Sequence, residues 1–271
     1  MKKTKQVLAI IAIVLLLGMY VAAFVLAFMK SEHAQILFRA ALGATILVPV
    51  LLYLVLMVAR MLKPAKSAVI DAVIFDLGLV LIDWPWEEHA ASVGISEEAI
   101  REIGEKVIHD PAWLEFDRSV KPEEEIVNDL VKLVPGYEED LRKLIATMDK
   151  CCEPFWYTEG WLKGLRQKGY KLYYLSNWSR TGQHKVAERG AMDFLKLMDG
   201  GVWSYEHHEV KPEKEIFQRI IRQYQLNPAR TIFIDDNEGN VAAAKKEGLV
   251  AIRFLDINDI TEKLGSLGVK W

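Results

Sequence analysis

One stretch, Ala72–Asp83 (AVIFDLGLVLID), constrains the fold more than any other part of the 271-residue chain. Five of the six residues from Ala72 to Leu77 are apolar and the exception is Asp76, a pattern that predicts a buried strand ending in a carboxylate. A buried carboxylate needs a partner or a function, because its desolvation is costly. Gly78 follows where the chain leaves the strand and its backbone can approach a ligand closely. Ligands bind at this end of the strands in open α/β sheets, so we expect a site around Asp76.

Residues 1–66 differ in composition from the rest of the chain. They contain two long uncharged segments, 7–29 with 23 residues and 40–59 with 20 residues. Each segment is long enough to cross the hydrocarbon core of a membrane as a helix. The polar turn Lys30–His33 between them is too short for a domain. We therefore predict a transmembrane helical hairpin whose two ends lie on the same side of the membrane.

The distribution of lysine and arginine predicts the orientation of this hairpin. Three such residues precede the first segment and three follow the second, whereas two lie between the segments. The excess places both termini and the remaining domain in the cytoplasm, as parts of a multi-pass protein of the cell membrane. A cleaved signal peptide is the alternative, but the first segment is too long for one and a second segment follows. The residues counted are Lys2, Lys3, Lys5, Lys30, Arg39, Arg60, Lys63 and Lys66.

The charge of the two parts has opposite sign. Residues 1–66 hold eight Lys and Arg and one acid, which leaves 26 Lys and Arg against 36 Asp and Glu in residues 67–271. An acidic domain is not expected to bind a nucleic-acid backbone. The basic flanks of the hairpin are explained by topology and by anionic lipid headgroups. The oligomeric state stays open at this stage.

Residues 67–271 alternate strand and helix patterns, which is typical of an α/β fold with a parallel sheet. The expected helices are bounded by glycines and capping residues. The predicted strands are 68–76, 171–176, 201–204, 231–235 and 250–254, and the predicted helices are 158–168, 180–189, 213–225, 237–247 and 256–263.

The alternation is interrupted between the first two strands. Residues 84–155 carry helical apolar spacing, with helices expected at 97–109, 123–133 and 137–150. A crossover between parallel strands does not need so many residues. We therefore predict a small helical domain inserted into a core made of residues 67–83 and 156–271, in a position to act as a lid.

Polar side chains follow the predicted strands at their carboxyl ends. Each alone has a simpler explanation as a helix cap, a turn or a solvated charge. Together the carboxylates offer hard oxygen ligands of the kind that hold Mg²⁺ beside a phosphate, and the serine, amide and lysine donate to phosphoryl oxygens. A carboxylate can also attack phosphorus to give an aspartyl phosphate. The residues at the strand ends are Asp76, Ser176, Asn177, Asp235 and Asp236, and the lysine is Lys211, which with Pro212 opens a helix.

These residues resemble, in order, the four motifs of the haloacid dehalogenase (HAD) superfamily, on its phosphatase side. The motifs read VIFDLGLVLID, YYLSNWS, EVKPEKEIF and FIDDNEGNVAAAKKEG, and the segment from Trp113 to Arg118 also resembles the helical cap of that group. The resemblance implies a Rossmann-like core with an inserted α-helical cap and a small phosphorylated metabolite as substrate.

The resemblance also implies a role for each motif residue. Asp76 would be the nucleophile and a Mg²⁺ ligand, and Ser176 and Lys211 would hold the transferring phosphoryl group. Asp236 would bind the metal with support from Asp235. Asn240 would fix that acidic loop. The paired acids argue against the dehalogenase branch, which needs no metal.

Gly78 departs from the family pattern, because phosphatases of this family usually carry there a second Asp that acts as general acid and base. The glycine can lend a backbone carbonyl to the metal but cannot move a proton. Three hypotheses follow. The substrate has an easy leaving group, such as that of a sugar 1-phosphate; or Asp83, Glu87 or His89 supplies the proton; or the chain is a membrane-tethered binding or regulatory module with little turnover.

Overall fold

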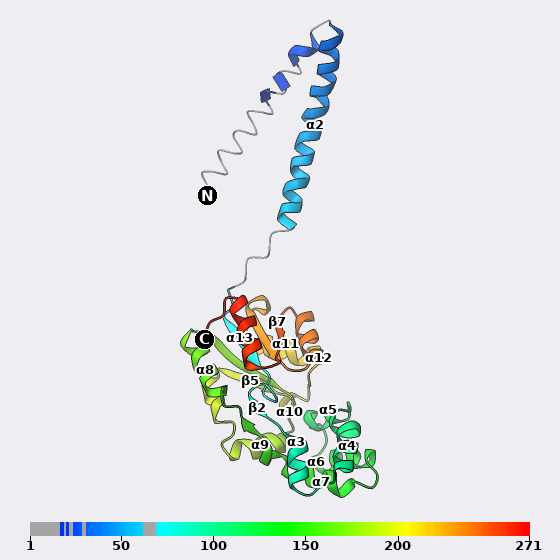
Figure 1. Ribbon diagram of the computed structural model, residues 1–271, viewed down its shortest axis with the longest axis vertical. Helices are drawn as coiled ribbons and strands as arrows, with labels where there is room; N and C mark the ends of the chain where they lie inside the picture. Colours follow the sequence, from blue (N-terminus) through cyan, green and yellow to red (C-terminus); the bar gives the residue numbers. More distant parts are fainter. Residues whose placement is uncertain (1–16, 19, 22–23, 29–30, 62–68) are drawn as a thin grey trace. The chain divides into compact units, whose positions relative to one another are not determined.

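The computed structural model divides into two compact units, Met1–Lys66 and Ser67–Trp271. Each unit is described by itself. The residues described are 17–18, 20–21, 24–28, 31–61 and 69–271 (Figure 1).

The first unit contains a long apolar helix, α2 (Glu32–Met61). The Ser31 hydroxyl accepts a hydrogen bond from the Ala34 amide at 3.2 Å, so Ser31 caps the helix and the predicted polar turn ends two residues earlier than expected. Among the described residues, one segment, His33–Leu51, is long and apolar enough to span a membrane. The other predicted span, 7–29, lies mostly outside the described residues, so the described chain supports one candidate span rather than two.

The second unit is built around a parallel sheet with β1 at its centre. The strand order is β5-β4-β1-β6-β7. In the register of the sheet, Val73 of β1 lies between Leu172 and Ile232 of its two neighbours. The predicted α/β core with a parallel sheet is thereby confirmed. The strands are β1 (Ala72–Phe75), β4 (Lys171–Ser176), β5 (Gly200–Trp203), β6 (Thr231–Asp235) and β7 (Val250–Arg253).

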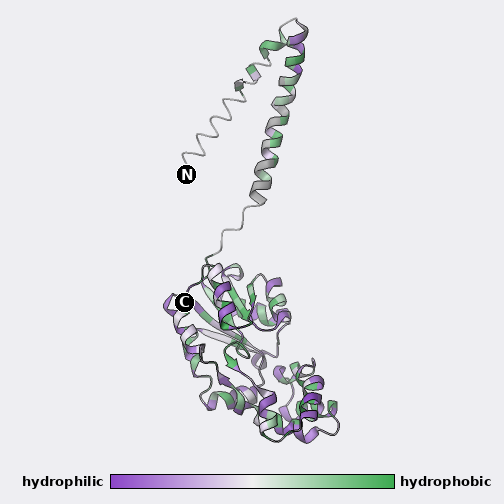
Figure 2. Ribbon diagram, in the orientation of Figure 1, coloured by the Kyte–Doolittle hydropathy of each residue, from purple (hydrophilic) through white to green (hydrophobic). Residues whose placement is uncertain are grey.

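Alternate residues of β1 face two helical layers, as the period of a strand requires. Val73 and Phe75 belong to a core cluster that includes side chains of α8, α9 and α13. Ala72 and Ile74 belong to a second cluster with side chains of α11 and α12. Figure 2 shows the hydrophobic strands between helices that carry hydrophilic residues. The helices are α8 (Thr158–Gln167), α9 (Arg180–Glu188), α10 (Ser204–His207), α11 (Lys214–Gln223), α12 (Glu238–Lys246) and α13 (Ile257–Ser266), with 3-10 turns η4 (Asp193–Leu197) and η5 (Pro228–Arg230).

A helical cap lies between β2 (Ile82–Asp83) and β3 (Glu153–Pro154), which pair antiparallel so that the chain enters and leaves the cap side by side. The cap has its own apolar core, which includes Trp86, Phe116 and Leu144. Its elements are α3 (Trp86–Ser92), α4 (Glu97–Ile103), the π-helical η1 (Gly104–Ile108), α5 (Trp113–Arg118), α6 (Glu123–Leu130), η2 (Val131–Leu133), α7 (Glu138–Thr147) and η3 (Met148–Cys151).

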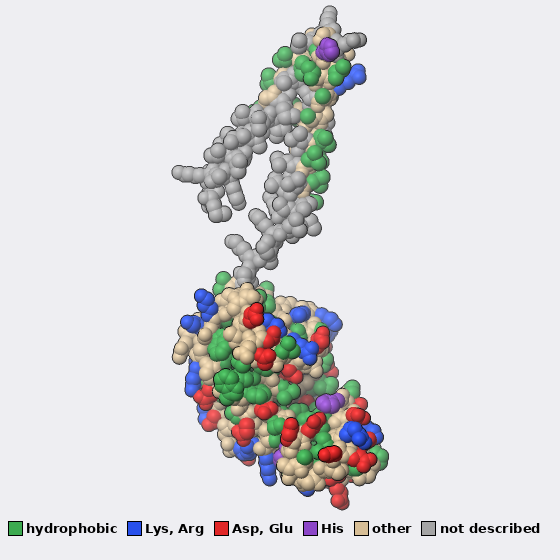
Figure 3. Space-filling model, viewed as in Figure 1, with side chains coloured by type: hydrophobic (Ala, Val, Ile, Leu, Met, Phe, Trp, Pro, Cys, Tyr) green, Lys and Arg blue, Asp and Glu red, His purple; other side chains and the backbone are tan. Residues whose placement is uncertain are grey.

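The cap helices are shorter than the sequence predicts. The expected helix 97–109 changes to a π-helix at Gly104, where an added Cβ would lie 3.1 Å from the Trp86 ring. The short helices α3 and α5 were not predicted, because a helix of six or seven residues shows too few apolar repeats. The surface of the second unit mixes acidic and basic side chains, with hydrophobic side chains between them (Figure 3).

We predict that Phe75→Ala destabilises the protein by about 3–5 kcal/mol, because Phe75 is fully buried and its ring packs edge-on against Trp161 at 4.9 Å. Urea unfolding of the full chain in detergent measures this. Leu255→Ala is the control, since Leu255 is 61% exposed, and it should change the free energy of unfolding by less than about 0.5 kcal/mol. Similar losses in the two variants would contradict the described core.

Candidate active site

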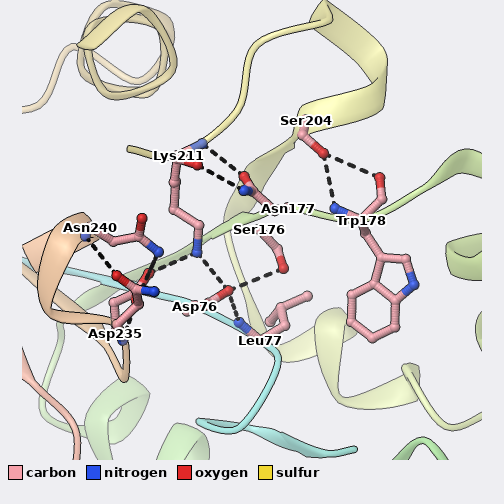
Figure 4. Close-up of polar contacts among 10 residues, drawn as sticks. Asp76, Leu77, Ser176, Asn177, Trp178, Ser204, Lys211, Asp235 and Asn240 are labelled. Atoms are coloured by element: carbon pink, nitrogen blue, oxygen red, sulfur yellow. Dashed lines mark hydrogen bonds and ion pairs between the residues drawn. The ribbon is translucent and has the colours of Figure 1, made fainter. Parts of the chain in front are cut away.

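The carboxyl ends of three adjacent strands bring the predicted polar residues together. Asp76 directly follows β1, Ser176 is the last residue of β4, and Asp235 is the last residue of β6. Since β4, β1 and β6 are neighbours and parallel, their ends lie at one edge of the sheet. All three side chains are buried there (Figure 4).

Lys211 joins two of these carboxylates. Its Nζ lies 2.8 Å from Oδ1 of Asp76 and 2.8 Å from Oδ2 of Asp235, and the Lys211 side chain is 1% exposed. Burial lowers the pKa of Lys211, but attraction to Asp235 and Asp76 outweighs burial and holds the pKa above its ordinary value. The ammonium therefore stays charged and fixes the spacing of the two acids.

Two asparagines hold this arrangement in place. The Asn177 side chain donates to the Lys211 carbonyl at 3.0 Å and accepts from the Lys211 amide at 2.8 Å. Asn240 donates to both carboxylate oxygens of Asp235 at 3.0 Å. Asn240 thus makes the contact that the sequence suggested for it. The side-chain amide of Asn177 positions the Lys211 loop instead of pointing freely at a phosphate.

Asp76 has the surroundings of a reactive carboxylate. Its Oδ1 accepts from the Leu77 amide at 2.7 Å and from the Ser176 hydroxyl at 3.2 Å. Burial raises the pKa of Asp76 to about 7, with repulsion from Asp235 and Asp236 adding to the rise and Lys211 opposing it. Burial and then Asp235 also raise the pKa of Asp236. The site therefore concentrates more negative charge than its lysine offsets.

That excess charge fits a divalent cation. Oxygen atoms of Asp76, Asp235 and Asp236 all lie within 4.8 Å of one another. Three carboxylates against one ammonium leave two negative charges, and carboxylate oxygens are the ligands that Mg²⁺ prefers. The donor set thus suits Mg²⁺. Gly78 lines the same cavity, where its backbone carbonyl is available as a further oxygen.

The site opens into a cavity of about 240 Å³ between the core and the cap. Acidic residues of the core and of the cap line it, and much of the remaining wall is apolar or aromatic. Trp113 of the cap and Trp178 of the core both line it. Its apolar side chains are Leu79, Trp84, Trp113, Phe116, Met148, Cys152, Trp178 and Val186.

The acids suggested as substitutes for the missing motif Asp do not line this cavity. Asp83 lies in the β2–β3 ribbon, where its Oδ1 accepts from the Trp84 amide at 2.9 Å. Nε2 of His89 is hydrogen-bonded to the Thr147 hydroxyl at 3.0 Å, and Glu87 is exposed. Asp83 lies in the β2–β3 ribbon and Glu87 and His89 lie in α3 of the cap.

The sequence analysis gave no role to Asp117, a cap residue that lines the cavity. Asp117 is 8% exposed, and burial raises its pKa to about 8. A signal was present, because Trp113, Phe116 and Asp117 stand three and four residues apart and so share one face of α5. All three line the cavity.

Comparison with known proteins places this geometry in a family. Residues 70–248 match the model of the haloacid dehalogenase-like hydrolases. The sesquiterpene phosphatase astK of Aspergillus oryzae is 24% identical over 186 residues, which cover 68% of this chain and 90% of that protein. The drimenol cyclase drtB of Aspergillus calidoustus is 23% identical over 201 residues, but the match covers only 36% of that longer protein.

Solved structures share the fold. The HAD family enzyme bt-2542 of Bacteroides thetaiotaomicron, in complex with magnesium and inorganic phosphate, is 22% identical with a TM-score of 0.54, covering 70% of this chain and 98% of that one. The L-2-haloacid dehalogenase of Xanthobacter autotrophicus, with chloropropionic acid covalently bound, is 17% identical with a TM-score of 0.53, covering 74% and 84%. The family match extends over most of the α/β unit, and the chain belongs to the haloacid dehalogenase-like hydrolases.

Proposed function

We propose that this hydrolase is a Mg²⁺-dependent phosphatase that cleaves phosphate monoesters through an aspartyl phosphate on Asp76. The observation that carries the proposal is the ion-paired cluster of Asp76, Lys211 and Asp235, whose Asp76 lines the cavity between the core and the cap. A buried carboxylate beside an ammonium and a hydroxyl matches the needs of in-line attack on phosphorus. The similarity to astK, a phosphatase, supports the same reaction class.

Each residue has a defined task in this reaction. Asp76 attacks phosphorus with a carboxylate oxygen and releases the alcohol. Lys211 and Ser176, both hydrogen-bonded or ion-paired to Asp76, donate to the phosphoryl oxygens where transition-state charge develops. Asp76, Asp235, Asp236 and the Gly78 carbonyl would hold Mg²⁺, which when bound supplies positive charge beside the phosphoryl group. Water then hydrolyses the aspartyl phosphate.

For the substrate, we propose a monoester of an apolar alcohol, such as a prenyl phosphate. The aromatic and aliphatic wall of the cavity supports this class, because such a surface gains free energy by covering an apolar chain. The name of astK, a sesquiterpene phosphatase, points the same way. A sugar 1-phosphate is the second candidate, because Gly78 leaves the motif without its usual acid and an anomeric oxygen departs easily.

The membrane assignment is also a proposal. The candidate span His33–Leu51 supports attachment to the cell membrane, with the hydrolase unit on the cytoplasmic side as the lysines and arginines suggest. A membrane-attached enzyme meets apolar phosphate esters where they partition. The predicted hairpin of 7–29 and 40–59 places both termini in the cytoplasm. Attachment by this helix alone places the two termini on opposite sides of the membrane. A reporter fused after Trp271 separates the two arrangements.

The first prediction concerns activity. The full chain in detergent with Mg²⁺ should hydrolyse farnesyl phosphate with a higher kcat/KM than glucose 1-phosphate, and Asp76→Asn should lower phosphate release at least ~10³-fold. Phosphate release over a panel of both ester classes measures this. The reverse substrate order favours the sugar phosphatase. Tight phosphate binding with no Asp76-dependent release favours the membrane-tethered binding module.

The second prediction concerns the metal and pH. In the metal-free protein the pKa of Asp76 is about 7, so Asp76 carries a proton in more molecules at pH 6 than at pH 8. Mg²⁺ needs the carboxylate form, and its binding should therefore release more protons at pH 6 and become tighter as pH rises. Calorimetry in buffers of different ionisation enthalpy measures the proton release. Asp76→Asn should reduce the pH difference, and equal release at both pH values in the wild type would contradict the assignment.

A further inference from the structure

The cap places two buried acids, Asp117 and Asp149, in the wall of the catalytic cavity, and Asp117 is the one whose protonation is influenced by Lys211 and Asp76 of the catalytic cluster. Asp117 on α5 is more than nine-tenths buried and lines the cavity together with Asp76. Among the hydrogen bonds and ion pairs of the described residues, none involves the Asp117 carboxyl group. Its backbone carbonyl, in contrast, accepts from the Ser204 hydroxyl at 2.8 Å. The backbone is thus anchored while the carboxyl group is left for another molecule.

The core, not only the cap, determines where this acid lies. Arg118 donates two hydrogen bonds to the Glu213 carboxylate, from Nη1 to Oε2 at 2.9 Å and from Nη2 to Oε1 at 2.8 Å. Arg118 also donates to the His208 carbonyl at 3.1 Å, and the His208 ring is hydrogen-bonded to the Arg118 carbonyl at 2.9 Å. These contacts surround Asp117 in sequence and tie α5 to the loop that leads to Lys211. These contacts fix the position of α5, and with it Asp117, against the core.

The charged groups that act on the Asp117 carboxyl are those of the catalytic cluster. Lys211 attracts it and Asp76 repels it, and burial is the largest influence on its protonation. With a pKa near 8, the carboxyl group is mostly protonated at neutral pH. A protonated carboxyl close to the nucleophile can donate a proton, as a general acid must.

We infer that Asp117 is the general acid and base of this enzyme, supplied by the cap in place of the acid that Gly78 lacks. The inference rests on the proposed phosphatase reaction. In the usual family motif the acid lies in the loop after β1, at the position of Gly78, whereas here it lies on α5 of the cap. Proton transfer therefore requires that α5 lie against the core.

The proton is conserved over the two half-reactions. As Asp76 forms its bond to phosphorus and the ester P–O bond breaks, Asp117 gives its proton to the departing oxygen, which leaves as the alcohol. The Asp117 carboxylate then takes a proton from the water that attacks the aspartyl phosphate. The bond between phosphorus and the Asp76 oxygen breaks and phosphate leaves. Asp76 is again a carboxylate and Asp117 is again protonated.

A leaving-group comparison tests this. With the full chain in detergent and Mg²⁺, Asp117→Asn should lower kcat/KM for an alkyl phosphate by about 10²–10⁴-fold, because an alkoxide departs poorly without a proton. For 4-nitrophenyl phosphate, whose phenolate departs unaided, kcat/KM should fall by less than about 10-fold, since this ratio reports on the first half-reaction. Asp83→Asn is the matched control, and both of its ratios should stay within about 3-fold of wild type. Equal losses for the two esters in Asp117→Asn would overturn the assignment.

A rescue variant strengthens the test. An added Cβ at Gly78 meets no atom within 4 Å, so Gly78→Asp can install the usual family acid. Gly78→Asp should restore alkyl phosphate hydrolysis at least ~10-fold in the Asp117→Asn background, and not in Asp76→Asn. Asp149 is the other buried acid of the cap that lines the cavity. If Asp149→Asn, and not Asp117→Asn, shows the leaving-group dependence, the inference is wrong.

Two further measurements keep the outcomes distinct. Thermal unfolding reports whether Asp117→Asn folds. If it does not fold, the smaller substitution Asp117→Ser takes its place in the same leaving-group comparison. The proposed function itself fails only when wild type shows no Asp76-dependent hydrolysis of 4-nitrophenyl phosphate. If wild type shows that hydrolysis but Asp117→Asn shows no dependence on the leaving group, only the role assigned to Asp117 is overturned.

Discussion

The ion pairs of Lys211 with Asp76 and Asp235 are the interaction on which the site depends. Two carboxylates at the ends of adjacent buried strands repel each other, and the Lys211 ammonium lies within 2.8 Å of an oxygen of each. The lysine offsets part of this repulsion and leaves an excess of negative charge. The same excess that weakens the metal-free site is what makes it suitable for a divalent cation and a phosphoryl group.

The cap completes a site that the core only begins. The strand ends supply the nucleophile and the hydroxyl, and the loop between α10 and α11 supplies the ammonium, whereas the cap supplies most of the aromatic wall and Asp117. The α5 contacts with Glu213 and His208 hold these two sets of groups together. The packing of the cap against the core therefore supplies the apolar wall and, in our proposal, places the proton donor beside the substrate.

Several features were predictable because they depend on local pattern. The strand and helix order of the core follows apolar periodicity, and the gathering of Asp76, Ser176 and Asp235 follows from the shared direction of parallel strands. The helical cap was visible as an interruption of that order. Its short helices were less predictable, and so was the start of α2, because one capping serine shifts a boundary more than composition can reveal.

The sequence by itself determined which chemistry the strand ends could carry, since residue type and strand direction are enough to collect three acids, a serine and a lysine at one edge. Only the tertiary structure decided which acid could replace the one missing at Gly78. Asp83 is nearer in sequence, yet it lies in the β2–β3 ribbon and does not line the cavity. Asp117 is brought there by contacts such as Arg118–Glu213, which join residues 95 positions apart. Pairings over that distance depend on how two packed surfaces fit, which no local pattern encodes.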